Sequence, residues 1–397
     1  MGILNEAKKC QKEFVEYRRY LHEHAEVGFA LEKTVAFVEE KLKEMDYTPQ
    51  KCGKAGLTAT VGKGNRTFLL RADMDGLPIR EQTRLPFACK SGNMHACGHD
   101  MHTAMLLGAA KLLKAHEREL KGTIKLLFQP AEERLQGAQD CIEGGVLRGV
   151  NGAMMLHVMT ATELPVGTAV VASSGVSAPA ADYFTIQVHG KSCHGSAPWN
   201  GVDALTAAAH LLVSLQEISA REISLAKPAV LTVGTFSAGS APNVIADSAI
   251  LKGTLRAFDE ETRDTLKKRL TEIAKGTAKA FRARAKITFD SGCPTLVNDS
   301  DLSAFAESAA KDLLGEQVVF NSAQLSGGSV AAKNGGSEDF AYISQEIPSV
   351  MLALSAGEIN KGYEYPLHHP KAVFDENAIC YGAGLYAHIA MEWLKNG

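Results

Sequence analysis

Hydrophobic and polar positions change period several times along the chain, and each period predicts a different kind of element. Residues 5–46 carry apolar side chains at helical spacing, among them Phe14, Tyr17 and Leu21. Short apolar runs then alternate with amphipathic stretches, which is typical of a parallel or mixed sheet covered by helices on both faces. The elements that we expect in this part are strands at 67–72, 123–129 and 153–158 and a helix at 103–115.

The pattern changes near residue 180 and changes back near residue 292. The order strand, helix, strand, strand, helix, strand between these points predicts a ferredoxin-like unit. Its expected strands lie at 183–189, 229–237, 243–258 and 286–290, and its helices at 203–215 and 260–281. The elements expected after it are a helix at 301–313, a Gly/Ser loop at 326–336, a strand at 349–354 and a helix at 377–394. We therefore predict a discontinuous domain of residues 1–180 and 292–397, interrupted by an inserted domain at 181–291.

Composition and charge narrow the class of protein. A chain of 397 residues with 45% hydrophobic and 22% charged residues is expected to form two folded domains. The formal net charge of −3 argues against a nucleic-acid partner, which needs a concentrated basic face. We find no signal peptide and no apolar run near 18 residues, so we expect no membrane partner. Eight scattered cysteines favour buried thiols and a reducing, cytoplasmic location.

A cluster of histidine and cysteine precedes the helix expected at 103–115. In Met94-His95-Ala96-Cys97-Gly98-His99-Asp100, Cys97 and His99 stand two residues apart with glycine between them. In a loop, this spacing lets both side chains converge on one ion, and thiolate with imidazole suits zinc or a similar transition metal. Taken alone, the segment is also compatible with a helix cap followed by buried polar residues.

Two adjacent acids follow the strand expected at 123–129. Glu132 and Glu133 stand where open α/β sheets bind ligands. Neighbouring carboxylates repel unless a metal neutralises one of them, so we assign Glu133 as a metal ligand and Glu132 as a general base. A surface turn is the alternative interpretation.

His157, at the end of its strand, and one histidine of the pair His368-His369, near the C-terminus, complete the candidate ligands. Taken alone, each is more typical of a histidine that binds no metal, such as a satisfied core residue, but the five candidates together favour a metal centre. A catalytic metal usually keeps three protein ligands and an open position, so five ligands serve two ions if one is shared. Our candidate for the shared ligand is the Cys97 thiolate.

Asp73 and Asp75 also emerge from a strand end, in Arg71-Ala72-Asp73-Met74-Asp75. Acids at this position orient ligand histidines in metal centres, or else they cap a turn. We therefore include Asp75 among the candidate catalytic residues.

These motifs, in this order, resemble the amidohydrolase branch of the aminoacylase/carboxypeptidase metallopeptidases, which includes hippurate hydrolases, bacterial N-acyl-amino-acid amidohydrolases and plant auxin-conjugate hydrolases. The resemblance covers essentially the whole chain. The motifs that carry it are R-A-D-M-D-G-L-P-I (71–79), M-H-A-C-G-H-D-M-H-T-A (94–104), F-Q-P-A-E-E (128–133), L-H-V (156–158), H-G-S-A-P (194–198), N-V-I-A-D (243–247), G-T-L-R (253–256), G-S-E-D-F (336–340) and L-H-H-P (367–370).

The resemblance implies a di-metal exopeptidase-like catalytic domain and an inserted lid that also serves as the surface of a homodimer. It implies two divalent ions per subunit, zinc or manganese with cobalt or nickel as alternatives. The ligands that it implies are Cys97, His99, Glu133, His157 and, as the first histidine of the C-terminal pair, His368. Glu132 matches the general base, and His194 matches a histidine that stabilises the oxyanion, often from the partner subunit. Asn243 and Arg256 match residues that contact the substrate carboxylate or its surroundings.

The implied reaction is hydrolysis of the amide bond of N-acyl or aroyl amino acids. A di-metal dipeptidase or aminopeptidase that acts on free-amine peptides is one alternative. A hydrolase with Cys97 as nucleophile and a non-catalytic metal- or peptide-binding protein are two others. The chain departs from the family pattern at Ala25 and at Trp199-Asn200. These departures affect the expected shape of the substrate pocket, so the resemblance does not define the substrate specificity.

Overall fold

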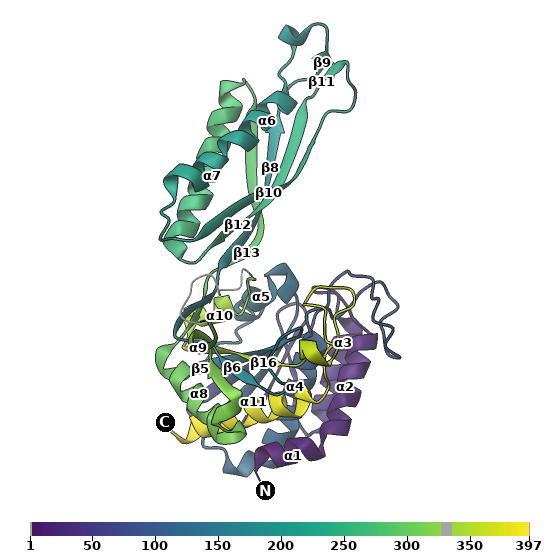
Figure 1. Cartoon of the computed structure of the whole chain (residues 1–397), viewed down its shortest axis with the longest axis vertical. Coiled ribbons are helices and arrows are strands. Elements are labelled where there is room, and N and C mark those ends of the chain that lie inside the picture. The colour runs from purple at the N-terminus through teal and green to yellow at the C-terminus, as the bar shows by residue number, and fades with distance from the viewer. Residues whose placement is uncertain (1, 327–335, 397) are drawn as a thin grey trace. The chain divides into compact units, whose positions relative to one another are not determined.

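The computed structural model describes residues 2–326 and 336–396, which form two compact units (Figure 1). Among these residues, unit 1 contains 2–177, 297–326 and 339–396, and unit 2 contains 178–296 and 336–338. The Gly/Ser loop expected at 326–336 lies almost entirely outside the described residues. No described helix is both long and apolar enough to cross a membrane.

Unit 1 is built on a mixed eight-stranded sheet with the order β1-β2-β4-β3-β5-β16-β6-β15. Its strands are β1 (Gln50–Cys52), β2 (Gly56–Gly62), β3 (Thr67–Asp73), β4 (Thr123–Gln129), β5 (Gly152–Met159), β6 (Ala169–Val171), β15 (Val319–Asn321) and β16 (Ser349–Ser355). Strand β3 runs parallel to both β4 and β5, and β16 runs parallel to β5. The carboxyl ends of these four central strands therefore meet at one edge of the sheet.

Helices cover both faces of this sheet. They are α1 (Ile3–Lys9), α2 (Gln11–Glu23), α3 (Glu32–Glu44), α4 (His99–Ala115), α5 (Gly137–Glu143), α8 (Ser300–Leu314), α9 (Ser322–Ser326), α10 (Ala341–Glu346) and α11 (Ala378–Lys395). Alternation along β3 separates the two faces. Phe68 and Leu70 join the main core with α4 and α11, whereas Arg71 points to the other face and bonds Asp339, which lies just before α10. The α/β class with a mixed sheet is therefore confirmed.

Unit 2 has the predicted ferredoxin-like order of elements. It contains β8 (Ala180–His189), α6 (Ala204–Ser214), β10 (Ala229–Ala238), β12 (Ser248–Ala257), α7 (Glu260–Ala280) and β13 (Arg284–Cys293). The four strands form an antiparallel sheet in the order β10-β12-β8-β13, and α6 and α7 share a core with it. Each helix begins at an aspartate, Asp203 or Asp259, whose side chain accepts a backbone N–H of the first turn. The chain passes between the units within β7 (Gly175–Ala178) and β14 (Leu296–Asn298).

The structure corrects two predicted elements. The single helical segment at 5–46 is three helices, because the chain turns between α2 and α3 with Gly28 at a φ of +66°. The strand at 243–258 is two strands, β11 (Val244–Ile245) and β12. The carbonyls of Ala246 and Asp247 between them accept backbone N–H groups of Ala204 and Gly190 instead of continuing one ladder.

Candidate active site

The five predicted metal ligands lie together at the carboxyl-end edge of the unit 1 sheet. His157 lies within β5, and Cys97 and His99 lie at the start of α4. Gly98 makes this turn with a φ of +83°, and a Cβ there would lie 2.4 Å from Val158 Cγ2, so only glycine fits between the two ligands. Two hydrogen bonds of the Cys97 Sγ close the cluster: His157 Nε2 is 3.4 Å away and His368 Nε2 is 3.3 Å away.

The ligand atoms form two triads that share Cys97. Cys97, His99 and His157 make one triad, and Cys97, Glu133 and His368 make the other, with all ligand atoms of each within 4.8 Å of one another. This sharing is the arrangement that the sequence analysis expected for two ions. It also meets the requirement of three protein ligands for each catalytic metal.

Buried polar atoms show that this cluster fits cations. His99 Nε2 is buried without a hydrogen-bond partner among the described residues, and the buried Glu133 Oε1 lies 3.4 Å from His368 Nε2 and 4.0 Å from His99 Nε2. The nearest carboxylate oxygens to His99 Nε2, from Asp73, Glu132 and Glu133, lie 3.8–4.0 Å away, which is too far for hydrogen bonds. Buried donors and acceptors without partners are costly, and a cation between them removes that cost.

Hydrogen bonds on the far side of two rings aim their Nε2 atoms into the cluster. His99 Nδ1 donates to the Asp75 carbonyl at 2.8 Å, and His157 Nδ1 donates to the Val158 carbonyl at 2.7 Å. Such contacts fix the orientation and tautomer of a ligand histidine. The remaining ligand of this kind, His368, is held in the left-handed region with a φ of +64°.

Asp75 connects the segment after β3 to the turn that carries Glu132 and Glu133. Its buried carboxylate accepts the backbone N–H of Glu132 at 3.0 Å and lies 3.3 Å from that of Glu133. The turn that carries both glutamates is flanked by Ala131 and Leu135, each with a positive φ. A strained turn persists only where its surroundings hold it, and Asp75 supplies that support.

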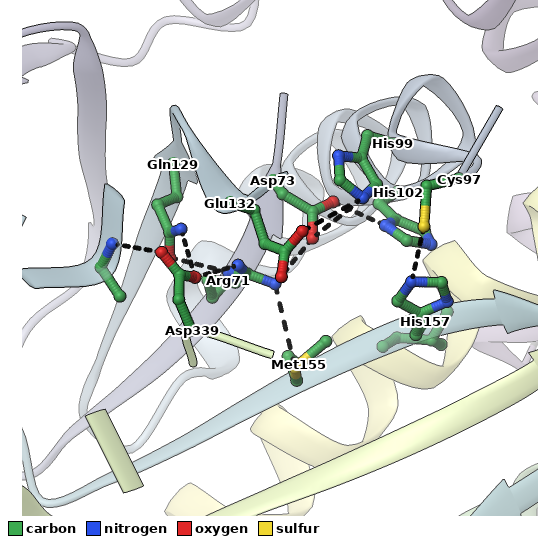
Figure 2. A network of polar contacts seen from close by, with 12 residues as sticks. Arg71, Asp73, Cys97, His99, His102, Gln129, Glu132, Met155, His157 and Asp339 are labelled. Carbon is green, nitrogen blue, oxygen red and sulfur yellow. Dashed lines mark hydrogen bonds and ion pairs between the residues drawn. The ribbon is translucent and has the colours of Figure 1, made fainter. Parts of the chain in front are cut away.

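A buried network of hydrogen bonds, formed by residues that are not among the predicted ligands, lies next to the ligand cluster (Figure 2). The Asp73 carboxylate accepts from Arg71 Nη1 at 2.7 Å and from His102 Nδ1 at 2.6 Å. His102 Nε2 accepts the Val158 N–H at 2.8 Å, so the ring is neutral with its proton on Nδ1. Burial, with repulsion from His157 and His99, agrees by lowering the pKa of His102 to about 4.

Arg71 extends this network away from the ligands. Its Nε donates to Gln129 and its Nη2 donates to Asp339 at 3.0 Å, and Asp339 also accepts the Ala138 N–H. The sequence contained one indication of this network, because an arginine in a buried strand needs a buried acid as its partner. The identity of that partner, more than 260 positions along the chain, was not available.

The three remaining candidates lie in unit 2. His194, in β9 (Cys193–His194), and Asn243 adjoin each other, because Gly195 N–H donates to the Asn243 carbonyl and β9 pairs with β11. Arg256 lies at the other end of the sheet, opposite Ala181 in β8. The nine steps from Ala180 to His189 measure about 30 Å, so His194 and Arg256 of one chain do not meet at one substrate.

The protonation of the metal-free cluster predicts how metal binding depends on pH. Burial opposes ionisation of the Cys97 thiol, but His157 and His99 outweigh it and hold its pKa at about 6. Burial opposes protonation of His157, but Cys97 raises its pKa to about 9, and hydrogen bonds to Cys97 and Glu133 raise that of His368 to about 10. At pH 7 the thiol is therefore ionised and both imidazoles carry a proton that a metal must displace.

We expect full loading with Zn²⁺ at pH 7 to release at least two protons per chain. The affinity should rise with pH up to about 10, where His368 loses its proton, and fall more steeply below pH 6, where the thiol also takes a proton. Calorimetric titration in two buffers with different ionisation enthalpies measures this release. Release of less than one proton, or an affinity that is constant between pH 6 and 9, would contradict this protonation pattern.

The similarity of this chain to known proteins covers all the candidate site residues. A model of the peptidase family M20/M25/M40 matches residues 69–392. N-acetyl-L-cysteine deacetylase of Bacillus subtilis (strain 168) is 38% identical over 373 residues, which cover 93% of this chain and 85% of the relative. Hippurate hydrolase of Campylobacter jejuni is 35% identical over 402 residues and 100% of both chains. Among solved structures, the YXEP protein of Bacillus subtilis, a dinuclear metal-binding peptidase from the M20 family, superposes with a TM-score of 0.78 at 32% identity over 98% of this chain and 99% of that chain.

Proposed function

Because this chain belongs to the peptidase family M20/M25/M40 and is an amidohydrolase, we propose that it hydrolyses the amide bond of N-acyl amino acids at a two-metal centre built on Cys97. The observation that carries the proposal is the pair of triads that share Cys97, with Glu132 beside them. The deacetylase and the hippurate hydrolase among its relatives are named for N-acylated amino acids, which supports this substrate class.

The proposed ligands are Cys97, His99 and His157 for one ion and Cys97, Glu133 and His368 for the other. A thiolate with two imidazoles favours zinc, and a carboxylate in the second triad also suits manganese. Two such ions would polarise the scissile carbonyl and lower the pKa of a water molecule between them.

Glu132 is the proposed proton carrier. Its side chain is almost fully buried, its oxygen lies 3.9 Å from His99 Nε2, and its backbone is held by Asp75. A carboxylate at this distance is placed to take the proton of the attacking water and to deliver it to the leaving nitrogen. We propose that Asp75 is a positioning residue, since its carboxylate bonds the backbone of the catalytic turn.

His194 is the proposed donor to the oxyanion. Its Nδ1 accepts the Ser196 N–H at 3.1 Å, so a neutral ring carries its proton on Nε2, which is the form that donates. His194 is exposed and lies at the end of the unit 2 sheet, about 30 Å or more from the points where the chain enters and leaves this unit. This reach supports a homodimer in which His194 and Asn243 serve the metal centre of the partner subunit, through a lid formed by residues 181–291.

Arg256 is the proposed contact for the substrate carboxylate. Its Nη1 donates to the Leu255 carbonyl, its guanidinium lies over the Tyr183 ring, and it forms no ion pair with any carboxylate of the described chain. Because it lies far from His194 of the same chain, it would act at a different centre from that histidine. All eight cysteines are free thiols, which supports the proposal of a reducing, cytoplasmic location.

Metal removal tests the proposed function. We expect a chelator to abolish hydrolysis of N-acetyl and N-benzoyl amino acids, and Zn²⁺ or Mn²⁺ to restore it, while unacylated dipeptides remain poor substrates. The assay is release of the free amino acid. Activity that persists after complete demetallation would contradict the metal mechanism, and a preference for free-amine dipeptides would instead indicate a dipeptidase.

Mixed dimers test the proposed role of His194. His194→Ala and Glu132→Gln homodimers should each be inactive with normal metal content. Mixing and re-equilibrating the two variants should restore up to about a quarter of wild-type activity, because half of the dimers are mixed and each of these has one complete centre. No recovery, with exchange of subunits verified by mass spectrometry, would contradict donation of His194 to the partner.

A further inference from the structure

A second polar site lies in unit 1, beside the loop that carries His368. A cavity of about 670 Å³ is lined by Gln82, Thr83 and Arg84 from one loop and by Gly362, Tyr365, Lys371 and Val373 from the other. We call it the Arg84 pocket. The two loops are joined where the Gln82 N–H donates to the Pro370 carbonyl at 2.8 Å.

The lining carries two cations and no carboxylate. Neither Arg84 nor Lys371 forms an ion pair with any acid in the described part of the chain, although Lys361, in the same loop as Lys371, pairs with Glu358 at 2.7 Å. The acid nearest to Arg84 in sequence, Glu81, is buried and held by His22 Nε2 at 3.0 Å and by the Cys89 N–H. Glu81 also accepts a hydrogen bond from Thr83, which lines the pocket, but no ion pair in the described part of the chain neutralises Arg84 or Lys371.

The backbone at Arg84 supplies a second, independent observation. Arg84 has a φ of +63°, in the left-handed region that glycine adopts without a steric penalty and that a long side chain adopts at a cost. Non-glycine residues held in this region concentrate at ligand-binding and active sites. The chain thus holds a guanidinium at the cavity in spite of backbone strain.

Two residues of the pocket lining are close along the chain to the proposed ligand His368. Tyr365 and Lys371 each stand three residues from His368, so their Cα atoms lie within about 11 Å of its Cα. The Tyr365 ring stacks on His369 with centroids 4.5 Å apart, and Lys371 Nζ lies 5.5 Å from the Tyr365 centroid. A short chain between the scissile carbonyl and an acidic group covers such a distance.

We propose that the Arg84 pocket binds a second carboxylate of the substrate, so that the enzyme prefers N-acyl amino acids with an acidic group besides the α-carboxylate. Arginine offers two parallel donors to a carboxylate and lysine adds a point charge. The inference rests on the proposed amidohydrolase function and narrows it to a class of dianionic substrates.

Matched substrate pairs test this preference in the metal-loaded enzyme. N-acetylglutamate against N-acetylglutamine places the acid on the amino acid, and N-succinylalanine against its succinamide analogue places it on the acyl group. We expect kcat/KM at least tenfold higher for the acid in one of these pairs, and this advantage should shrink as salt is added. Equal kcat/KM within both pairs would overturn the proposal, whereas no hydrolysis of any of the four compounds would overturn the proposed function instead.

Three variants connect the preference to the pocket. Arg84→Gly and Lys371→Gln should each reduce the acid-to-amide ratio roughly two- to fivefold, with kcat/KM for the neutral member within twofold of wild type. Arg84→Gly should melt no lower than wild type, because glycine relieves the positive φ. Lys361→Gln, the matched control, removes one charge from the same loop and should leave the ratio unchanged. An unchanged ratio in the first two variants, or an equal loss in the control, would contradict the assignment.

Inorganic phosphate separates a substrate site from a site for a free anion. Competition by phosphate against the acidic substrate alone agrees with the proposal. Activation of the neutral substrate by phosphate, lost in Arg84→Gly, would show that the pocket serves a separate anion and would overturn it. If hydrolysis is not seen at all, calorimetric binding of N-acetylglutamate against N-acetylglutamine to the metal-loaded protein compares the same pairs. Equal affinities for these two compounds would also overturn the proposal that the Arg84 pocket binds a second carboxylate.

Discussion

Replacement of Glu132 by glutamine is expected to lower kcat by about 10²- to 10⁴-fold while both metal ions stay bound. Glutamine has the same shape but does not accept a proton from the attacking water. The backbone contact with Asp75 does not depend on the Glu132 side chain, so the catalytic turn should be kept. Glu132 lies in neither of the triads that share Cys97, which is why the metal content should remain.

The matched control is Glu133→Gln, the same chemical change one residue further along. Glu133 belongs to the second triad, so this variant should lose about one metal ion per chain as well as activity. Elemental analysis of dialysed protein, together with steady-state kinetics, distinguishes the two variants. Normal turnover by Glu132→Gln would contradict the assignment of Glu132 as the proton carrier.

Replacement of Cys97 by alanine is expected to have the largest effect on the metal centre. Because Cys97 is common to both triads, each ion loses one of its three protein ligands at once. The variant would keep the other ligands, including His99 and Glu133, but it would lack the thiolate that the two triads share. Both ions should be lost on dialysis, with activity falling below detection.

Two controls separate this effect from the loss of any buried thiol. Cys141→Ala removes a buried free thiol in α5 that lies in neither triad, and should keep two ions. His368→Ala removes a ligand of one triad only and should leave about one ion. Retention of two ions by Cys97→Ala would contradict the shared ligand.

The predicted elements that matched the structure are those in which the local pattern and the tertiary environment agree. Strand β4 has the predicted bounds, 123–129, because its apolar residues Ile124 and Leu126–Phe128 are buried and point to both faces of the sheet. The hairpin of β1 and β2 was missed, since its segment is short and interrupted by glycine and lysine. Its pairing comes from β2 adding to the edge of β4, a long-range contact that no local pattern carries.

The proximity of the candidate site residues was predictable because parallel strands end at one edge of a sheet. Asp73 ends β3, Glu132 follows β4 and His157 lies near the end of β5, so topology brings them together. The contacts that orient them were not predictable. The neutral form of His102 follows from the Val158 N–H that it accepts, and that contact exists only after β5 is placed beside α4.

The measurement that tests the two-metal centre most directly is anomalous diffraction from crystals of the zinc-loaded protein. We predict two peaks per chain, roughly 3.5–4 Å apart, with the Cys97 sulfur between them, one peak beside His99 and His157 and the other beside Glu133 and His368. A single peak, or peaks that do not share the Cys97 sulfur, would contradict the centre proposed for this enzyme.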